Sequence, residues 1–366
     1  MYAYVARRLL LIPVTLFGIM VSNFIFAQLA PGGPVEQMLA KVRGQAVSAT
    51  ARISGDVGKE AAGSTGGAAG GPVSKYRGAR GLDPKFIAEL EHQYGFDKPP
   101  LERFAIMLGN YARLDFGKSF YRDESVVDLV LDKLPVSISL GLWSTIIIYL
   151  VSIPLGIAKA VRDGSRFDLA SSWVIVVGNA VPSFLFAILL IVLFAGGRFL
   201  SIFPLRGLHG DGWQSLSLIG QVGDYFWHLA LPVSSLVIGG FATLTMLTKN
   251  CFLEEVTKQY VVTARAKGLS ERRVLYGHIF RNAMLLVISG FPAVLVGILF
   301  GGSVLIETIF SLDGIGLLGY ESLINRDYPV VFGTLFAFSL IGLLLNLISD
   351  LTYHFVDPRI DFATRG

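Results

Sequence analysis

Residues 136–157 read VSISLGLWSTIIIYLVSIPLGI and contain no Asp, Glu, Lys or Arg. An α-helix rises about 1.5 Å per residue and the apolar core of a bilayer is about 30 Å thick, so about 20 apolar residues cross it. Each charged side chain at the membrane centre would cost about 2.5–3.5 kcal/mol on the insertion scale. The segment therefore predicts a transmembrane helix rather than the core helix of a soluble protein.

Five further segments have a similar length and character. They are residues 9–29, 171–196, 229–248, 283–306 and 331–348. The composition agrees with this interpretation, because 53% of the 366 residues are hydrophobic and only 16% are charged. Soluble proteins have about 25% charged residues. The mean hydropathy is +0.60. The predicted fold class is an all-α polytopic membrane protein with six transmembrane helices.

The first apolar segment shares one feature with secretory signal peptides, because Arg7 and Arg8 precede it. Its length of about 21 residues exceeds the 7–15 residues of a signal-peptide core. Pro31 and Pro34 also crowd the position where a peptidase would cut. Residues 1–30 are therefore expected to remain in place as an N-terminal transmembrane helix.

The basic residues of the short loops predict the orientation, because cytoplasmic loops carry the excess of Lys and Arg. These residues precede the first span and follow the second and fourth: Arg7, Arg8, Lys159, Arg162, Arg166, Lys249, Lys258, Arg265, Lys267, Arg272, Arg273 and Arg281. The loops after the third and fifth spans are poorer, with Arg198, Arg206 and Arg326. Both termini are therefore expected in the cytoplasm.

The long segment between the first two spans falls on the outer side and has two parts. Residues 31–81 are rich in Gly and Ala and too poor in large apolar groups to offset the entropy of ordering, which predicts a flexible insert. Residues 82–135 begin with Leu82-Asp83-Pro84 and carry apolar residues at helical spacing, which predicts a small helical cap on the outer side. The remaining parts are a five-helix transmembrane core (136–352), its cytoplasmic loop (249–282) and a cytoplasmic tail (353–366).

Several classes of function are excluded by missing motifs. Residues 112–119, ARLDFGKS, lack the first Gly of a phosphate-binding P-loop, follow no apolar strand and lie on the outer side. No His-Glu-x-x-His or Gly-x-Ser-x-Gly pattern occurs, and Cys251 is the single cysteine, too few for a disulfide or a zinc site. The net charge of +4 is too small to indicate nucleic-acid binding. The chain is predicted to be no enzyme and to hold no cofactor or metal of its own.

The loop between the fourth and fifth spans carries the most information. Residues 249–273 read KNCFLEEVTKQYVVTARAKGLSERR. Acidic Glu254 and Glu255 near the start and basic residues near the end predict a helix that ends at Gly268, where a left-handed residue belongs. Ser270 suits the N-cap of a second helix that runs into the fifth span.

The first of these helices suits a docking element. Small Ala264 and Ala266 beside Val261 and Val262 would allow close approach to a partner's groove, with the basic residues at its rim. The alternative is a solvated cytoplasmic loop, and the composition alone does not separate the two.

Residues 260–270, YVVTARAKGLS, resemble the cytoplasmic coupling-loop signature of the permease subunits of binding-protein-dependent ABC importers, in its oligopeptide/dipeptide form. Further segments resemble landmarks of that family in the expected order. They are APGGP (30–34), YGFDKP (94–99), DFGKS (115–119), LPVS (134–137), FSLDGIGLLG (310–319) and VDPRI (356–360). The resemblance covers nearly the whole chain, apart from residues 45–79.

This resemblance implies a type I importer permease in a bacterial inner membrane, with the outer side of the chain in the periplasm. Such a permease moves peptides, including peptide antibiotics of the microcin C kind, into the cytoplasm by alternating access. The implied partners are a sister permease in a heterodimer, an ATPase subunit that binds ATP and Mg, a periplasmic peptide-binding protein, and membrane lipids. The residues expected to couple the spans to the ATPase are Tyr260, Val261, Thr263, Ala264, Arg265, Ala266, Lys267, Gly268 and Ser270. Replacing Ala264 by Asp is expected to abolish transport.

The fifth span supplies candidates for the transport pathway. It carries Gly290, Pro292, Gly297, Gly301 and Gly302, which allow bending or close helix approach. A moving, pathway-lining helix at the interface with the sister permease is one interpretation, and ordinary small-residue packing is the other. Glu307, just beyond the span, is a candidate to bind the amino terminus of a peptide, with a solvated helix-end charge as the alternative.

Three classes of function are therefore compared. An ABC importer permease is favoured. An ion-coupled transporter usually places ionisable groups at mid-membrane, and the predicted spans hold none. A membrane scaffold would show no transport.

Overall fold

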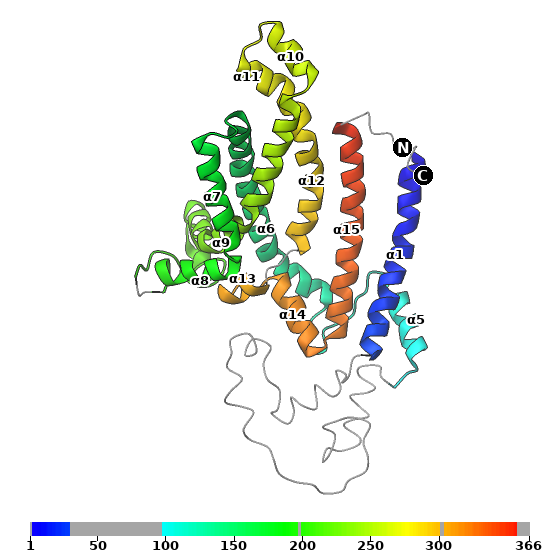
Figure 1. The fold of residues 1–366 in the computed structure, drawn as a ribbon. Coiled ribbons are helices and arrows are strands. Elements are labelled where there is room, and N and C mark those ends of the chain that lie inside the picture. Colours follow the sequence, from blue (N-terminus) through cyan, green and yellow to red (C-terminus); the bar gives the residue numbers. More distant parts are fainter. Residues whose placement is uncertain (1, 30–96, 197–198, 301–303, 357–366) are drawn as a thin grey trace. The chain divides into compact units, whose positions relative to one another are not determined.

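The computed structural model describes residues 2–29, 97–196, 199–300 and 304–356, and within these ranges the chain is helical with no β-strand (Figure 1). The helices are α1 (Tyr2–Leu29), α5 (Pro100–Tyr111), α6 (Val126–Val161), α7 (Arg166–Ala180), α8 (Ser183–Phe194), α9 (Leu218–Val256), α10 (Gln259–Ala266), α11 (Glu271–Val274), α12 (Phe280–Phe300), α13 (Val304–Ile309), α14 (Ile315–Asn325) and α15 (Tyr328–Val356). The predicted all-α class is confirmed. The predicted insert at 31–81, the start of the predicted cap and residues 357–366 of the tail lie outside the described residues.

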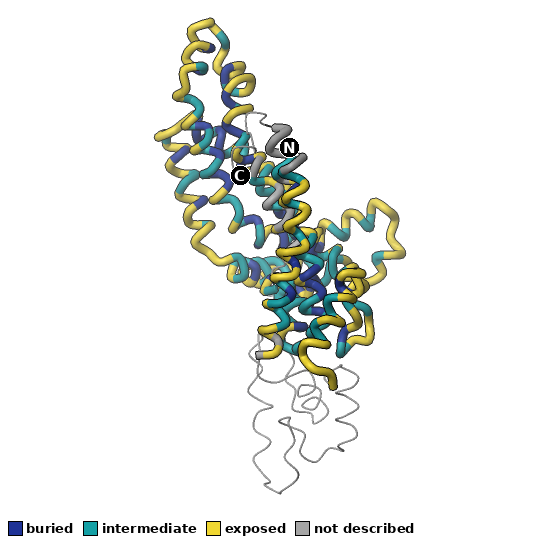
Figure 2. The backbone as a smooth tube through the Cα atoms, turned by 90° about the vertical axis from the view of Figure 1, so that its right-hand side faces the viewer, coloured by how far each residue is buried: buried dark blue, intermediate teal, exposed yellow. Residues whose placement is uncertain are grey.

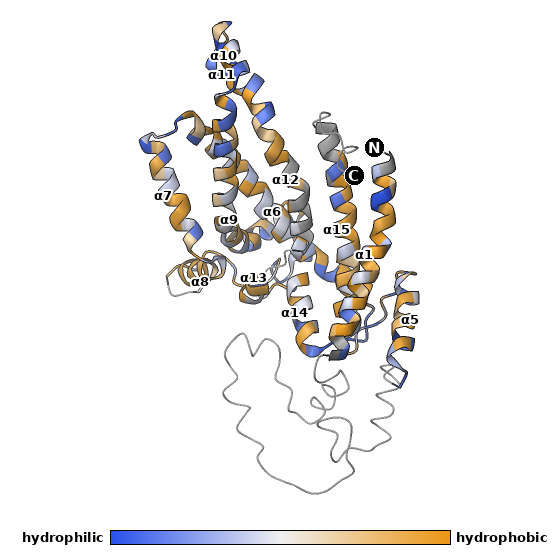
Figure 3. Cartoon of the chain, turned by 45° about the vertical axis from the view of Figure 1, so that its right-hand side comes forward, coloured by the Kyte–Doolittle hydropathy of each residue, from blue (hydrophilic) through white to orange (hydrophobic). Residues whose placement is uncertain are grey.

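Four helices in the described part of the chain are long and apolar enough to cross a membrane. These segments are Tyr4–Phe26, Val126–Val161, Leu218–Val256 and Tyr328–Ile348. They contain the apolar parts of four of the predicted spans, and α1 and α15 are orange over most of their length in Figure 3. At 36 and 39 residues, α6 and α9 are much longer than the roughly 20 residues that a crossing needs. Both helices therefore extend beyond an apolar layer of that thickness.

The predicted third span, 171–196, is not one continuous helix. It is divided into α7 and α8, which are bent by 93° at their junction. Val181 is extended, with φ −86° and ψ 118°, and it precedes Pro182. A proline disfavours the helical conformation in the residue before it and supplies no N–H to the preceding turn. The prediction of an unbroken helix there is wrong, although the two pieces together remain apolar enough to count as a fifth crossing.

The count of six spans stays a prediction. The fifth predicted span, 283–306, is covered by α12, which is 21 residues long, and by the first residues of α13. Residues 301–303 between these two helices lie outside the described part.

The chain divides into two compact units. The larger unit consists of residues 1–5, 134–316 and 342–366. Within it, α6 and α9 approach each other closely: a Cβ at Gly156 would lie 2.7 Å from Thr248 Cβ, and one at Gly240 would overlap Ile148. Ser152 Oγ donates a hydrogen bond to the Phe241 carbonyl (3.4 Å). Small side chains thus let these two helices lie in direct contact along several turns.

The smaller unit consists of residues 6–133 and 317–341. Phe104 of α5 lies against Phe24 of α1, with ring centroids 5.2 Å apart. In the same unit the segment before α6 is bound to the start of α15, because Asp327 accepts hydrogen bonds from Ser119 Oγ (2.5 Å) and from the Phe120 N–H (3.0 Å). The DFGKS segment thus has a structural role here.

Candidate functional site

The candidate site begins where α9 ends. Lys258 precedes α10 with φ −70° and ψ 149°, so the chain leaves the helix there and starts a new one at Gln259. Glu254 and Glu255 belong to the last turn of α9, and the prediction that they begin the docking helix is wrong. They still bind its first residues: Tyr260 Oη donates to Glu255 Oε2 (2.6 Å) and Lys258 Nζ donates to Glu254 Oε1 (3.1 Å). These bonds fix the angle between the two helices.

The electrostatics of this junction favour the same contacts. Burial, followed by the hydrogen bond to Glu255, raises the pKa of Tyr260 above its usual value. The phenol therefore remains protonated and continues to donate its hydrogen bond at all physiological pH values.

The end of α10 has the conformation that the sequence predicts. Gly268 has φ +78°, in the left-handed region. Its N–H donates to the Arg265 carbonyl (2.9 Å) and the Leu269 N–H donates to the Ala264 carbonyl (3.4 Å). A Cβ at Gly268 would meet nothing within 4 Å, so backbone conformation and not space favours glycine there.

A second short helix follows and leads into α12. Ser270 occupies the N-cap position of α11, as predicted, but its side chain makes no capping hydrogen bond. Its carbonyl accepts bonds from the N–H groups of Arg273 and Val274. Between α11 and α12, residues Leu275–Ile279 form a π-helical turn. Such turns are rare and frequently mark functional sites.

The helix α10 has two faces with different neighbours. Val261 is 0% exposed and Ala264 is 6% exposed, and both pack in a core with Phe252, Val274 and Ile279. Val262 is 54% exposed on the other face. Figure 2 shows this mixture of buried and exposed backbone in the hairpin that carries α10 and α11 at the top of the view.

The two faces change the expectation for individual residues. Among the predicted docking residues, Val261 and Ala264 are held in the protein's own core, so they position α10 rather than offer a surface to a partner. The exposed residues of the segment are Gln259, Val262, Thr263, Arg265, Ala266, Lys267, Gly268 and Ser270. Of these, Arg265 is partly engaged, because its guanidinium binds Glu271 at 2.9 and 3.2 Å.

The predicted pathway residues lie in several environments. Gly290 and Gly297 are in α12, and a Cβ at either would meet no atom of the described residues within 4 Å. Pro292 is also in α12, but its side chain lies outside the described part of the structure. Gly301 and Gly302 lie outside the described residues.

Glu307 is fully buried in α13. Its carboxyl carbon would lie 2.6 Å from a Cβ at Gly314, so the carboxyl group fills the space that this glycine leaves. A peptide in solution does not reach the Glu307 side chain in this conformation. The alternative of a solvated charge is equally inconsistent with its burial.

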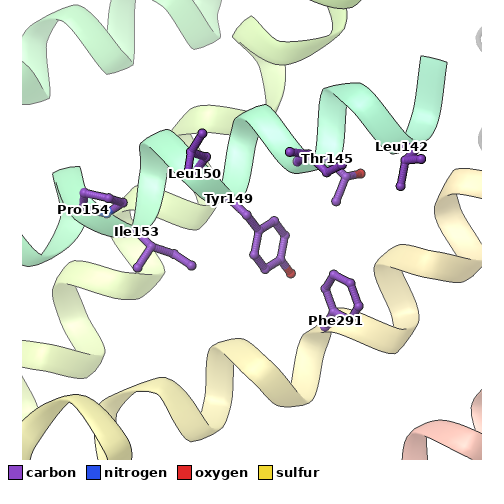
Figure 4. Close-up of a pocket in the computed structure, with 8 residues that line it drawn as sticks. Leu142, Thr145, Tyr149, Leu150, Ile153, Pro154 and Phe291 are labelled. Atoms are coloured by element: carbon purple, nitrogen blue, oxygen red, sulfur yellow. The ribbon is translucent and has the colours of Figure 1, made fainter. Parts of the chain in front are cut away.

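A cavity that the sequence analysis missed lies between α6 and α12. It has a volume of about 430 Å³ and is lined by Leu142, Thr145, Ile146, Tyr149, Leu150, Ile153, Pro154 and Phe291. Figure 4 shows Tyr149 of α6 and Phe291 of α12 pointing toward each other, and their rings lie edge to face with centroids 5.7 Å apart. The volume lies within the range of small-molecule sites. Tyr149 and Thr145, polar groups inside an apolar run, were the available signals in the sequence.

The residues that the structure describes contain no group of three or more His, Cys, Asp or Glu side chains placed to hold a metal ion.

Comparison with known proteins identifies the family. Residues 152–362 match the family model described as binding-protein-dependent transport system inner membrane component. The chain is 60% identical over 365 residues to the peptidoglycan transport system permease protein YejB of Agrobacterium fabrum, with all of both chains covered. It is 58% identical over 365 residues to the inner membrane ABC transporter permease protein YejB of Escherichia coli O157:H7, again with full coverage. The oligopeptide transport system permease protein AppB of Bacillus subtilis is 32% identical, covering 99% of this chain and 100% of its own.

These relatives agree with the resemblance found in the sequence. Within the family, the Gly-rich insert before Arg-Gly-Leu-Asp-Pro at residues 80–84 resembles the YejB branch, and the full-length matches confirm this relationship. Several long apolar helices and the inner-membrane family together indicate a multi-pass inner-membrane protein. The chain belongs to the family of binding-protein-dependent transport system inner membrane components.

Proposed function

We propose that this chain is the permease subunit of an ATP-driven ABC importer that carries peptides from the periplasm to the cytoplasm by alternating access. The observation that carries the proposal is the full-length identity of 58–60% to two YejB permeases. One of these relatives is named for peptidoglycan transport. Peptides released from peptidoglycan are therefore the first cargo to test, and peptide antibiotics of the microcin C kind are the second.

The importer needs subunits that this chain does not supply. We infer a heterodimer with a YejE-like permease, a YejF-like ATPase that binds ATP and Mg, and a YejA-like periplasmic receptor that delivers the peptide. ATP hydrolysis belongs to the ATPase subunit. The inferred topology has six spans, both termini and the loop at 249–282 in the cytoplasm, and the cap at 82–135 in the periplasm.

The outer face of α10 is the proposed contact with the ATPase. Val262 and Ala266 lie four residues apart, on one side of a helix, and both are exposed. An exposed apolar patch rimmed by polar or basic residues is the kind of surface that marks a protein–protein contact. The basic residue Lys267 lies at the end of this face and Arg272 follows in α11.

The inner face of α10 connects this helix mechanically to the transmembrane helices. Val261 and Ala264 pack against Phe252 of α9 and against Val274 and Ile279, which precede α12. A movement imposed on α10 by ATPase closure is therefore passed to both neighbours. The cavity between α6 and α12 is the proposed pathway element that this movement opens or closes.

A pull-down from native membranes in mild detergent tests the docking surface. Val262→Asp places a charge on the exposed face and is expected to remove the ATPase from the purified complex while the sister permease remains. Ile219→Asp is the matched control, because Ile219 is 87% exposed near the opposite end of α9. Ala264→Asp is unsuitable, because a charge in the buried position would disturb the fold itself.

Either of two results would contradict the proposal. If the wild-type protein copurifies with no ATPase, the importer assignment fails, and uptake that depends on the proton gradient is the next property to measure. If Val262→Asp retains the ATPase as fully as Ile219→Asp does, the docking face is elsewhere.

A further inference from the structure

A buried cluster of charges joins three helices near the end of α9 that leads into α10. It consists of Lys159 in α6, Asp168 in α7 and Lys249 in α9, and it is called the clamp below. Lys159 is 0% exposed. Its Nζ donates to the Asp168 carbonyl (2.8 Å) and lies 2.9 Å from Asp168 Oδ1. The neighbouring hydroxyl groups of Ser171 and Ser172 accept at 2.8 and 2.7 Å.

Asp168 connects this lysine to the third helix. Its Oδ2 accepts hydrogen bonds from Lys249 Nζ (2.8 Å) and from the Gly164 N–H (3.2 Å). Its own N–H donates to Ser165 Oγ (3.2 Å), which caps α7. Lys249 also binds Asp163 Oδ1 at 2.8 Å, on the half-exposed rim of the cluster. A single carboxylate thus holds amines from α6 and α9 at fixed positions.

General stability does not account for such an arrangement. Burying ion pairs costs desolvation energy, and apolar residues of similar volume often stabilise a protein as well or better. Removing one partner, in contrast, leaves an uncompensated buried charge. The feature that a clamp of this kind supplies is a defined geometry between the helices that it joins.

The position of the clamp relates it to α10. Lys249 lies in the part of α9 that ends at Val256, directly before α10. On the other side of the clamp, the contact of α6 with α9 continues through Gly156 and Thr248 toward Ile148. The helix α6 also supplies most of the residues that line the cavity.

We propose that Asp168 is a positioning residue for energy coupling. It binds α6 and α7 to the end of α9 that leads into α10, so that these three helices move as one rigid body when α10 moves. This inference rests on the proposed docking of an ATPase at α10. In the absence of the clamp, α10 would still bind its partner, but its movement would reach the cavity wall only partly.

Two variants separate positioning from the burial of charge. Asp168→Asn alone leaves one positive charge without compensation among Lys159, Lys249 and Asp163. Adding Lys159→Gln restores the balance of charge, because Lys249 keeps its partner Asp163 and no unpaired amine stays buried, while the carboxylate that joins α6 and α7 to α9 remains absent. Asp163→Asn is the control, because it removes only the rim partner of Lys249, and Asp168→Glu keeps the carboxylate.

The assembled importer in proteoliposomes, supplied with labelled peptides from digested peptidoglycan, gives the readout. The measured quantity is ATP hydrolysed per peptide imported, together with the amount of ATPase bound. The double variant is expected to bind the ATPase normally but to hydrolyse at least about tenfold more ATP per peptide. Asp163→Asn and Asp168→Glu are expected to stay within about threefold of wild type.

The proposal is overturned if the double variant assembles fully with a wild-type ratio of ATP to peptide, or if it fails to assemble although its charge is balanced. In the latter case the clamp serves folding alone. Failure of the proposed function has a different signature, because wild type itself would then hold no ATPase.

Discussion

Gly268 is the residue whose backbone conformation has the most direct effect on the candidate site. Because φ is +78° and the surrounding space is empty, Gly268→Ala is expected to cause conformational strain of about 1–2 kcal/mol without a steric clash. The variant should melt at a lower temperature in detergent and should lose part of its bound ATPase. Gly223→Ala, within α9 and also in open space, is the control and is expected to be neutral or stabilising.

The smaller unit contains a carboxyl group that makes its stability depend on pH. Burial raises the pKa of Asp327, although the hydrogen bonds from Ser119 and Phe120 act in the opposite direction. A carboxyl whose pKa is higher in the folded state stabilises the fold most below its unfolded value of about 3.9. This contribution disappears as the pH rises through the folded pKa.

Asp327→Asn should therefore remove a pH-dependent part of the stability. Relative to the variant, the wild-type protein is expected to gain most in melting temperature at about pH 4 and below, and to lose that gain as the pH rises. Thermal unfolding followed across this range measures the effect. Asp123→Asn is the control at a side chain that is 97% exposed. A difference between wild type and Asp327→Asn that stays constant with pH would refute this account.

At the scale of elements, the bend between α7 and α8 is not determined by proline alone. Pro135 and Pro154 lie inside the unbroken α6, and Pro232 lies inside α9. The helix α8 is also held by packing, since Ala187 is fully buried in a core with Leu229. Tertiary contacts thus support the bend that Pro182 favours locally.

Two substitutions distinguish these contributions. Pro182→Ala is expected to keep α8 in place and to change stability by less than about 1 kcal/mol, chiefly through the unfolded chain. Ala187→Leu is expected to destabilise the protein by about 1–3 kcal/mol, because the buried position has no room for the larger side chain. Thermal unfolding of both variants tests this order, and a larger loss from Pro182→Ala would assign the bend to the proline.

Local signals in the sequence predicted the elements that depend on local chemistry. Apolar length predicted the middle parts of α6 and α9, and the glycine after a basic last turn predicted the end of α10. The division of α10 into two faces was not predictable, because Val261 and Val262 are equally apolar and only the neighbours in the fold bury one of them. The broken third span needed tertiary packing as well as Pro182.

The same distinction applies to the sites. The clamp brings together Lys159, Asp168 and Lys249, of which Lys249 is 81 residues from Asp168 in the chain. The cavity similarly combines Tyr149 with Phe291. No spacing rule connects such residues, and they become visible only when α6, α7, α9 and α12 are packed together.

At the scale of the whole molecule, the inferred topology gives a labelling prediction. In a Cys251→Ser background, Asp123→Cys is expected to react with a membrane-impermeant maleimide applied to intact spheroplasts, because residue 123 is assigned to the periplasm. Lys267→Cys is expected to react only after the membrane is permeabilised. The reverse pattern would invert the orientation, and labelling of both residues from outside would contradict the predicted number of spans.

The π-helical turn at Leu275–Ile279 affects how insertions and deletions between α11 and α12 would change the orientation of α10. Val274 and Ile279 are both buried although they lie five residues apart, whereas a regular α-helix would separate them by about 140°. Deleting a single residue from this turn would leave an ordinary helix with its two flanking segments roughly in phase, because the π turn holds one extra residue in about one turn. A deletion in the regular part of α12 would instead rotate the segment before it by about 100° and turn the docking face away, although every side chain of α10 is unaltered. The number of residues between α10 and the membrane, and not only their identity, therefore determines where the docking face points.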